Sequence, residues 1–166
     1  KPFIANISRY KKVKSDEEYR TEFVTCAQAL LSKEFLRKHR LDEEYFFGVE
    51  EIDLSWRANG DGWNLFINPS SEVYHNVGSS TEEMFDGNLF SSFQKYHNTR
   101  GRLYFAAKNL GTLHSVSYYV AALSVFPAYY LWLGIRYGRV DILYAHLLSL
   151  YDYLLTSRVR GPERFG

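Results

Sequence analysis

Hydrophobic residues in the first hundred positions come in short runs that are separated by polar turns. Apolar side chains over residues 23–27, 63–67 and 72–75 predict three short strands, with a turn at 68–70. Ser32 can cap a short helix that runs to Lys38, and residues 50–59 predict a helix that ends at Gly60 or Gly62. Ser80 and Glu83 have the spacing of a capping box at the start of another helix. This part of the chain is therefore predicted to mix α and β structure.

The pattern changes beyond residue 112. Residues 115–135 are twenty-one consecutive positions without a charge, interrupted by Pro127. As a helix this run would extend about 31 Å, close to the hydrocarbon thickness of a bilayer. Pro127 and the tyrosine hydroxyls make a spanning helix costly, and a second apolar helix is predicted over 140–156. We therefore expect an amino-terminal part, residues 1–112, and a helical hairpin within a tail, residues 113–166, that associates with a membrane or a partner.

Charge divides the chain into three blocks. Residues 1–14 hold five bases and no acid, residues 15–86 hold sixteen acids and six bases, and the remainder holds nine bases and three acids. The acidic centre argues against free nucleic acid as a partner, and the basic flanks suit an anionic membrane surface. The aromatic content of 17% is enough for a large core. Because Cys26 is the single cysteine, no internal disulfide can form, which indicates a reducing compartment such as the cytoplasm.

One ordered set of residues carries the chemistry. Residues 42–57 read Asp-Glu-Glu-Tyr-Phe-Phe-Gly-Val-Glu-Glu-Ile-Asp-Leu-Ser-Trp-Arg, and Gly62-Trp63, Pro69 and His75 follow. This order resembles the inverting family 2 glycosyltransferases of the GT-A fold, in a rhamnosyltransferase-like form. Residues 104–109, Tyr-Phe-Ala-Ala-Lys-Asn, are similar to the segment that precedes hydrophobic tails in membrane-associated members. The implied fold is the acceptor-side half of a GT-A domain, a mixed sheet with helices, followed by an apolar helical hairpin.

The resemblance assigns catalysis to an acidic pair. Inversion requires a base that takes the proton of the acceptor hydroxyl, and a carboxylate suffices. Glu50 and Glu51 lie in the first turn of the predicted helix, where the macrodipole favours the ionised form, although acids there are often dipole partners alone. Consecutive helical positions differ by about 100°, so only one faces the cleft, and the resemblance implies Glu51. Asp53 and Arg57 have the spacing of a helical salt bridge and are expected to support the site.

Other residues are expected to bind the metal and the acceptor. The resemblance implies that His75 ligates a divalent cation, Mn²⁺ or Mg²⁺, as imidazole nitrogen can. Trp56 and Phe47 are candidates for stacking on the acceptor, with core packing as the alternative. Cys26 is read as a small buried hydrophobe. His97, His114 and His146 are read as structural or interfacial.

These observations lead to one expected function and two alternatives. The expected activity moves a sugar from a nucleotide-sugar donor to a glycan or polyisoprenyl-linked acceptor in cell-surface polysaccharide or glycoconjugate synthesis. No paired-aspartate motif or strand-rich donor-binding half precedes residue 21, so residues 1–166 alone are expected to be inert. The expected location is the cytoplasmic face of the membrane, and the tail helices offer a surface for association of two copies. The alternatives are a non-catalytic membrane-anchoring or partner-binding module and a decayed, carbohydrate-binding GT-A domain.

Overall fold

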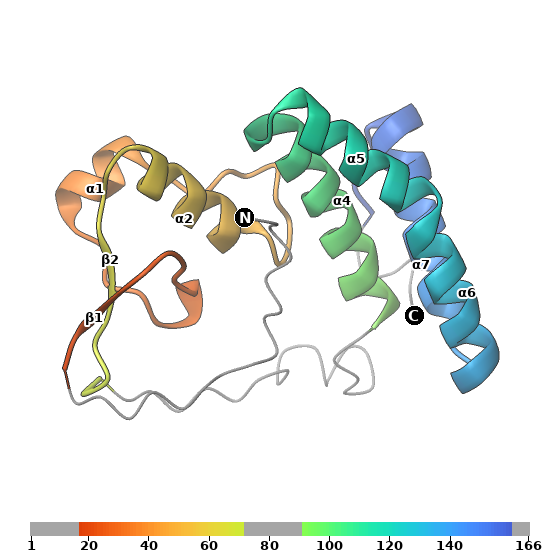
Figure 1. Ribbon diagram of the computed structural model, residues 1–166, viewed down its shortest axis with the longest axis horizontal. Coiled ribbons are helices and arrows are strands. Elements are labelled where there is room, and N and C mark those ends of the chain that lie inside the picture. The colour runs from red at the N-terminus through yellow and green to blue at the C-terminus, as the bar shows by residue number, and fades with distance from the viewer. Residues whose placement is uncertain (1–16, 72–90, 161–166) are drawn as a thin grey trace.

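A computed structural model describes residues 17–71 and 91–160 of the chain (Figure 1). Helices hold 64% of these residues, and a two-stranded sheet joins them. The first described stretch contains strand β1 (Tyr19–Thr21), a 3₁₀ turn (Cys26–Gln28), helices α1 (Lys33–Lys38) and α2 (Glu50–Gly60), and strand β2 (Leu65–Ile67). The second contains helices α4 (Ser92–Asn109), α5 (Thr112–Leu123), α6 (Val125–Tyr137) and α7 (Val140–Tyr151) and a π-helical turn (Asp152–Thr156). The combination is compatible with a mixed α/β fold.

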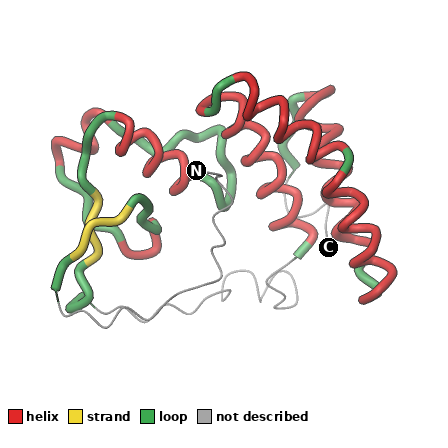
Figure 2. The backbone as a smooth tube through the Cα atoms, in the orientation of Figure 1, coloured by secondary structure: helices red, strands yellow, loops and turns green. Residues whose placement is uncertain are grey.

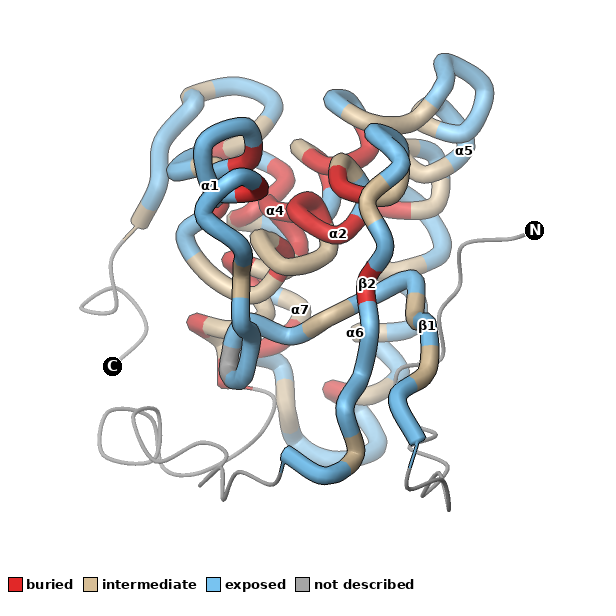
Figure 3. Tube along the Cα trace, turned by 90° about the vertical axis from the view of Figure 1, so that its left-hand side faces the viewer, coloured by how far each residue is buried: buried red, intermediate tan, exposed pale blue. Residues whose placement is uncertain are grey.

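The smaller lobe packs α1, α2 and the sheet around one apolar cluster. Its buried members are Phe35 of α1, Leu54 and Ala58 of α2, and Leu65 of β2. The strands are antiparallel, with Tyr19 opposite Ile67 and Thr21 opposite Leu65. Figure 3 shows α2 largely buried or half-buried between this sheet and the rest of the molecule, with the strands more exposed.

The larger lobe is a helical bundle around α4 (Figure 2). Helix α4 begins at a capping box, in which the Ser91 hydroxyl accepts from the backbone N–H of Gln94 and the Gln94 side chain accepts from that of Ser91. Helix α7 packs against both α4 and α6. Gly138, with φ of 70°, makes the sharp turn between α6 and α7. This pair is the helical hairpin that the apolar pattern predicted.

Close approach of α4 to the loop before α2 joins the two lobes. Tyr45 and Val49 of that loop pack on Phe105 of α4. A Cβ atom on Gly101 of α4 would lie 2.8 Å from a methyl carbon of Val49, so only glycine allows this approach. The predicted boundary at residue 112 stays a prediction, and α4 contacts elements on both sides of it.

Several predicted elements are confirmed and one is wrong. The Ser32 hydroxyl accepts from the N–H of Phe35 and caps α1, and α2 ends at Gly60 as expected. Residues 23–27 do not form a strand: β1 lies earlier, and a 3₁₀ turn begins at Cys26. The reason is that side chains of α2 bind the backbone there, as described below. The predicted strand at 72–75 and the helix start at Ser80 lie outside the described residues.

Pro127 breaks the long uncharged helix, as the sequence indicates, but the break lies three residues earlier. Helix α5 ends at Leu123, Ser124 has φ of −124° and ψ of −65°, and α6 resumes at Val125. Proline has no N–H to donate to the carbonyl four residues before it, and its ring crowds that carbonyl. The interruption therefore falls in the preceding turn, and Pro127 itself lies in the first turn of α6.

Candidate active site

The two acids predicted for catalysis lie side by side in the first turn of α2 and have different partners. Glu50 turns back on its own helix, and its Oε2 accepts from the Val49 N–H at 2.8 Å. Glu51 points toward the preceding segment, where its Oε1 accepts from Thr25 Oγ1 at 3.2 Å and from the Cys26 N–H at 3.3 Å. Both of these contacts use Oε1. Glu50 acts as a helix cap.

Glu51 is also the first member of a polar row along α2. One turn later the Ser55 hydroxyl accepts from the Val24 N–H at 3.2 Å, and a further turn on, the Asn59 amide donates to the Glu22 carbonyl at 2.8 Å. Asn59, Ser55 and Glu51 bind backbone groups of residues 22, 24 and 26, respectively. Glu51 also accepts from the Thr25 hydroxyl. These three side chains satisfy groups that a strand would otherwise pair with another strand. The row thus explains why the predicted strand does not form and fixes the position of the Glu51 carboxylate.

Cys26 is exposed, so the prediction of a buried hydrophobic cysteine is wrong. The carboxylates of Glu51 and Glu50 lie near its thiol. Partial burial and then the charges of these two acids raise the pKa of the thiol. A protonated thiol is a poor nucleophile, so the surroundings of Cys26 do not activate it.

Asp53 is fully buried and is the centre of a network that joins α2 to α4. Its Oδ1 accepts from Asn109 Nδ2 at 2.8 Å and from the Tyr45 hydroxyl at 3.1 Å. Its Oδ2 accepts from Arg57 Nε at 2.7 Å and from Lys108 Nζ at 3.1 Å. The predicted i, i+4 salt bridge between Asp53 and Arg57 is confirmed within α2, and its acid is buried rather than solvated.

Lys108 connects this network to the loop before α2. Its ammonium group lies 2.6 Å from Asp42 Oδ2, which also accepts from the Tyr104 hydroxyl at 3.2 Å. Burial opposes ionisation of Asp53, but hydrogen bonds from Asn109, Lys108 and Arg57 outweigh it and hold the pKa of Asp53 below its usual range. The carboxylate stays charged at neutral pH. Asp53 therefore positions α2 and is already neutralised by two bases.

The predicted acceptor-binding aromatics lie away from Glu51. Trp56 is 40% exposed and meets the ring of Phe105 edge-on, on the side of α2 that faces α4. Five residues separate it from Glu51, which corresponds to about 140° around the helix. Phe47 is half-buried and packs at a tilt against Phe93 of α4. Both aromatics therefore contact α4, and their role in binding an acceptor stays a prediction.

The expected metal site cannot be assembled from the described residues. His75 lies outside them, and within them no group of three or more histidine, cysteine or acidic side chains could hold a metal ion. Asp42 and Asp53 are not open ligands, because Lys108 neutralises the first and shares the second with Arg57. A divalent cation therefore stays a prediction that depends on His75.

Structural or interfacial roles were predicted for His97, His114 and His146, and two of these three have structural contacts. His97 stacks on Phe46 and lies 3.1 Å from the Arg160 carbonyl, and burial lowers its pKa to about 4. His146 is fully buried between the Ala122 carbonyl, at 2.9 Å, and Thr99. Both rings join segments of the helical bundle. His114 is exposed.

The sequence did not indicate that Lys108 and Asn109 bind Asp53. They belong to the quoted stretch 104–109, but fifty-five residues separate Lys108 from Asp53. A lysine and an asparagine at a helix end are a weak signal by themselves, because such residues also cap carbonyls.

No family model, curated protein or solved structure matches this chain. The roles of the site residues therefore rest on their geometry and on the order of the motif.

Proposed function

We propose that this chain is the acceptor-side part of an inverting glycosyltransferase that moves a sugar from a nucleotide-sugar donor to a glycan or lipid-linked acceptor. One observation carries the proposal: the two stretches that resemble the family meet in space. Asp53 of the first stretch accepts hydrogen bonds from Lys108 and Asn109 of the second. This link holds the first turn of α2, with Glu50 and Glu51, against the helical bundle.

In this proposal Glu51 is the catalytic base. Its carboxylate removes the proton from the acceptor hydroxyl while that oxygen bonds to the anomeric carbon, and the bond from that carbon to the donor diphosphate breaks on the opposite face. Contacts from Thr25 and Cys26 orient the carboxylate. A divalent cation would neutralise the departing diphosphate, with His75 as the predicted ligand.

The test compares Glu51→Gln with Glu50→Gln in the protein expressed from its complete gene. Release of nucleoside diphosphate from a panel of uridine, guanosine and thymidine diphosphate sugars is measured with and without glycan or polyisoprenyl phosphate acceptors. Removing the base should lower the rate by about 10² to 10⁴, and Glu50→Gln should lower it much less. Donor affinity should change little.

Ser55→Ala is the matched control for a purely structural role of Glu51. It removes the next contact of the same row, the one to the Val24 N–H, without removing a carboxylate. Glu51→Gln keeps an amide oxygen that can still accept from Thr25 and Cys26. If Ser55→Ala lowers the rate as much as Glu51→Gln does, Glu51 only positions the segment 22–26 and the proposal for its role is wrong.

A non-catalytic membrane-anchoring or partner-binding module is the second candidate. The exposed apolar side chains of α5 and α6 favour it. Absence of turnover by the complete protein with every donor, together with binding through these helices, would favour this candidate over the enzyme. Retained glycan binding without turnover would instead indicate a decayed carbohydrate-binding domain.

A further inference from the structure

Helices α5 and α6 direct their polar groups toward the protein interior. The Ser115 hydroxyl donates to a carbonyl of α4 at 2.7 Å, and the Tyr119 hydroxyl donates to another at 3.2 Å. The Tyr130 hydroxyl accepts a hydrogen bond from Lys95 of α4. A helix at a water-exposed surface normally buries its apolar row and exposes such hydroxyls. Here Tyr119 and Tyr130 use their hydroxyls to bind α4, whereas Tyr129 is 52% exposed.

The opposite side of the same helices is apolar and exposed. Leu113 is 76% exposed and Ile135 is 80% exposed, at the two ends of the row. On α5, Val116 and Val120 follow Leu113 at intervals of three and four residues. On α6, the exposed members are Leu131 and Trp132. We call this row the outer face. Helices α5 and α6, which carry it, lie on the side of the molecule away from α1 and the sheet (Figure 1).

The serine hydroxyls of this region are satisfied within the helix. Ser117 donates to the Leu113 carbonyl at 2.8 Å, and Ser124 donates to the Val120 carbonyl at 2.6 Å. A hydroxyl that bonds to the carbonyl four residues earlier does not need water. The outer face can therefore leave water without orphaning these two polar groups.

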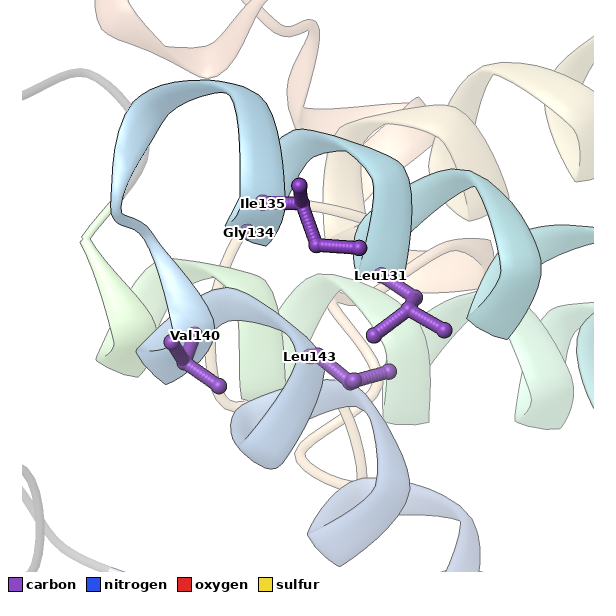
Figure 4. Close-up of a pocket in the computed structure, with 5 residues that line it drawn as sticks. All are labelled: Leu131, Gly134, Ile135, Val140 and Leu143. Atoms are coloured by element: carbon purple, nitrogen blue, oxygen red, sulfur yellow. The ribbon is translucent and has the colours of Figure 1, made fainter.

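The outer face continues onto α7 at the tip of the hairpin. Five residues line a hollow there with a volume of about 120 Å³: Leu131, Gly134, Ile135, Val140 and Leu143. Figure 4 shows these aliphatic side chains around the hollow between α6 and α7. The lining is hydrocarbon from both helices, so the apolar surface is continuous across the turn.

Charge and aromatic residues favour a lipid surface over a protein partner. Residues 91–140 contain six bases and no acid. Arg102 and Arg136 are exposed, and no carboxylate in the described parts of the chain forms an ion pair with either. Near Arg136, Trp132 stacks on Tyr129 and meets the ring of Tyr137 edge-on. Tryptophan, tyrosine and arginine together are typical of the level of phospholipid headgroups.

We propose that the outer face of α5 and α6 inserts into one leaflet of an anionic phospholipid membrane, with the α6–α7 tip at the headgroups. Residues Thr112–Tyr137 are long and apolar enough to cross a bilayer, with a mean hydropathy of 1.3. Their inner side, however, packs on the rest of the bundle, α5 on α4 and α6 on α7, and Lys108 of α4 ion-pairs with Asp53 of α2. Lipid therefore contacts one side of the helices, and the segment lies in the interface. This proposal does not depend on glycosyl transfer.

Flotation with vesicles tests the proposal on the full chain. Vesicles of phosphatidylcholine alone are compared with vesicles that contain one quarter phosphatidylglycerol, at low and high salt. The protein should float with the anionic vesicles and less with the neutral ones. Ile135→Asp should lower the partition coefficient by about 10-fold or more, because a charge on the outer face must leave water. Arg136→Gln should weaken binding to anionic vesicles only.

Leu30→Asp is the matched control, because Leu30 is a fully exposed leucine outside the bundle. It should float like the unmodified chain. A second measurement avoids introducing a charge. An environment-sensitive fluorophore is attached to Val120→Cys in a Cys26→Ser background. Its emission should shift to the blue with anionic vesicles, and the same label at Leu30→Cys should not shift.

Three results would overturn the proposal. The first is a chain that stays unbound at low salt with an unshifted label on Val120→Cys. The second is flotation of folded Ile135→Asp, verified by circular dichroism, equal to that of the unmodified chain. The third is a dimer in solution that Ile135→Asp dissociates and that vesicles do not bind, which would mean that a second copy covers the outer face.

Discussion

Replacing Asp53 by asparagine should destabilise the protein by about 3 kcal/mol. Removing one partner of a buried ion pair typically costs about 3–5 kcal/mol, since the remaining charges lose their counter-ion. Asp53 is fully buried, whereas the side chains of Arg57 and Lys108 are 24% and 28% exposed. Both bases keep another acceptor after the change: Arg57 donates to the Arg40 carbonyl, and Lys108 binds Asp42. These contacts place the expected loss at the lower end of the range.

Urea unfolding at neutral pH, followed by the helical circular-dichroism signal, measures this loss. With a typical slope of about 2 kcal/mol per molar urea, the midpoint should fall by about 1–2 M. The control is Asp61→Asn. Asp61 forms ion pairs with the exposed Lys38 and with His39, and its own side chain is 42% exposed, so Asp61→Asn should lower the urea midpoint much less than Asp53→Asn does.

A double-mutant cycle isolates the link between the lobes. Lys108→Met and Asp53→Asn are combined, and their coupling energy should exceed about 1 kcal/mol, because the two groups lie 3.0 Å apart in the ion pair. If Asp53→Asn costs no more than Asp61→Asn, the reasoning from burial is refuted. Additive effects of the pair would refute the assignment of Lys108 as a partner of Asp53.

Two further predictions concern pH and helix capping. Because the folded pKa of Asp53 is lowered, its contribution to stability is complete above its unfolded value near 3.8 and is lost as pH falls through the folded value. The urea midpoint of the unmodified chain should therefore fall more between pH 6 and about pH 3 than that of Asp53→Asn, and equal declines would contradict the sign. Ser91→Ala removes the hydroxyl that accepts from the Gln94 N–H and should cost about 1 kcal/mol, whereas Ser91→Asp, which keeps a cap, should cost less; no difference between the two in urea unfolding would argue against the cap.

Local sequence pattern predicts α2 correctly but does not predict the structure of residues 23–27. The end of α2 at Gly60 and the pairing of Asp53 with Arg57 follow from a terminal glycine and from i, i+4 spacing within eleven residues. The segment 23–27 has strand-like apolar residues, but its backbone donors go to Glu51 and Ser55. That competition depends on where α2 lies, which no local pattern contains.

The candidate site divides in the same way. Its acidic pair and its supporting salt bridge could be read from spacing, and the role of Glu51 as a base stays a prediction. The partnership of Asp53 with Lys108 and Asn109 could not be read, because contacts between residues so far apart arise only when α2 and α4 pack. The separation of Trp56 from Glu51 follows from the helical rotation between them, which aims Trp56 at α4.

Apolar helices with a break near Pro127 could be predicted after residue 112, because length, absence of charge and proline act locally. Which side of those helices is exposed depends on contacts with other elements of the fold. The carbonyls of α4 bind the hydroxyls of Ser115 and Tyr119, and this turns the aliphatic row outward. A uniformly uncharged run has no polar face to orient it in advance, so its orientation depends on the acceptors that its neighbour presents.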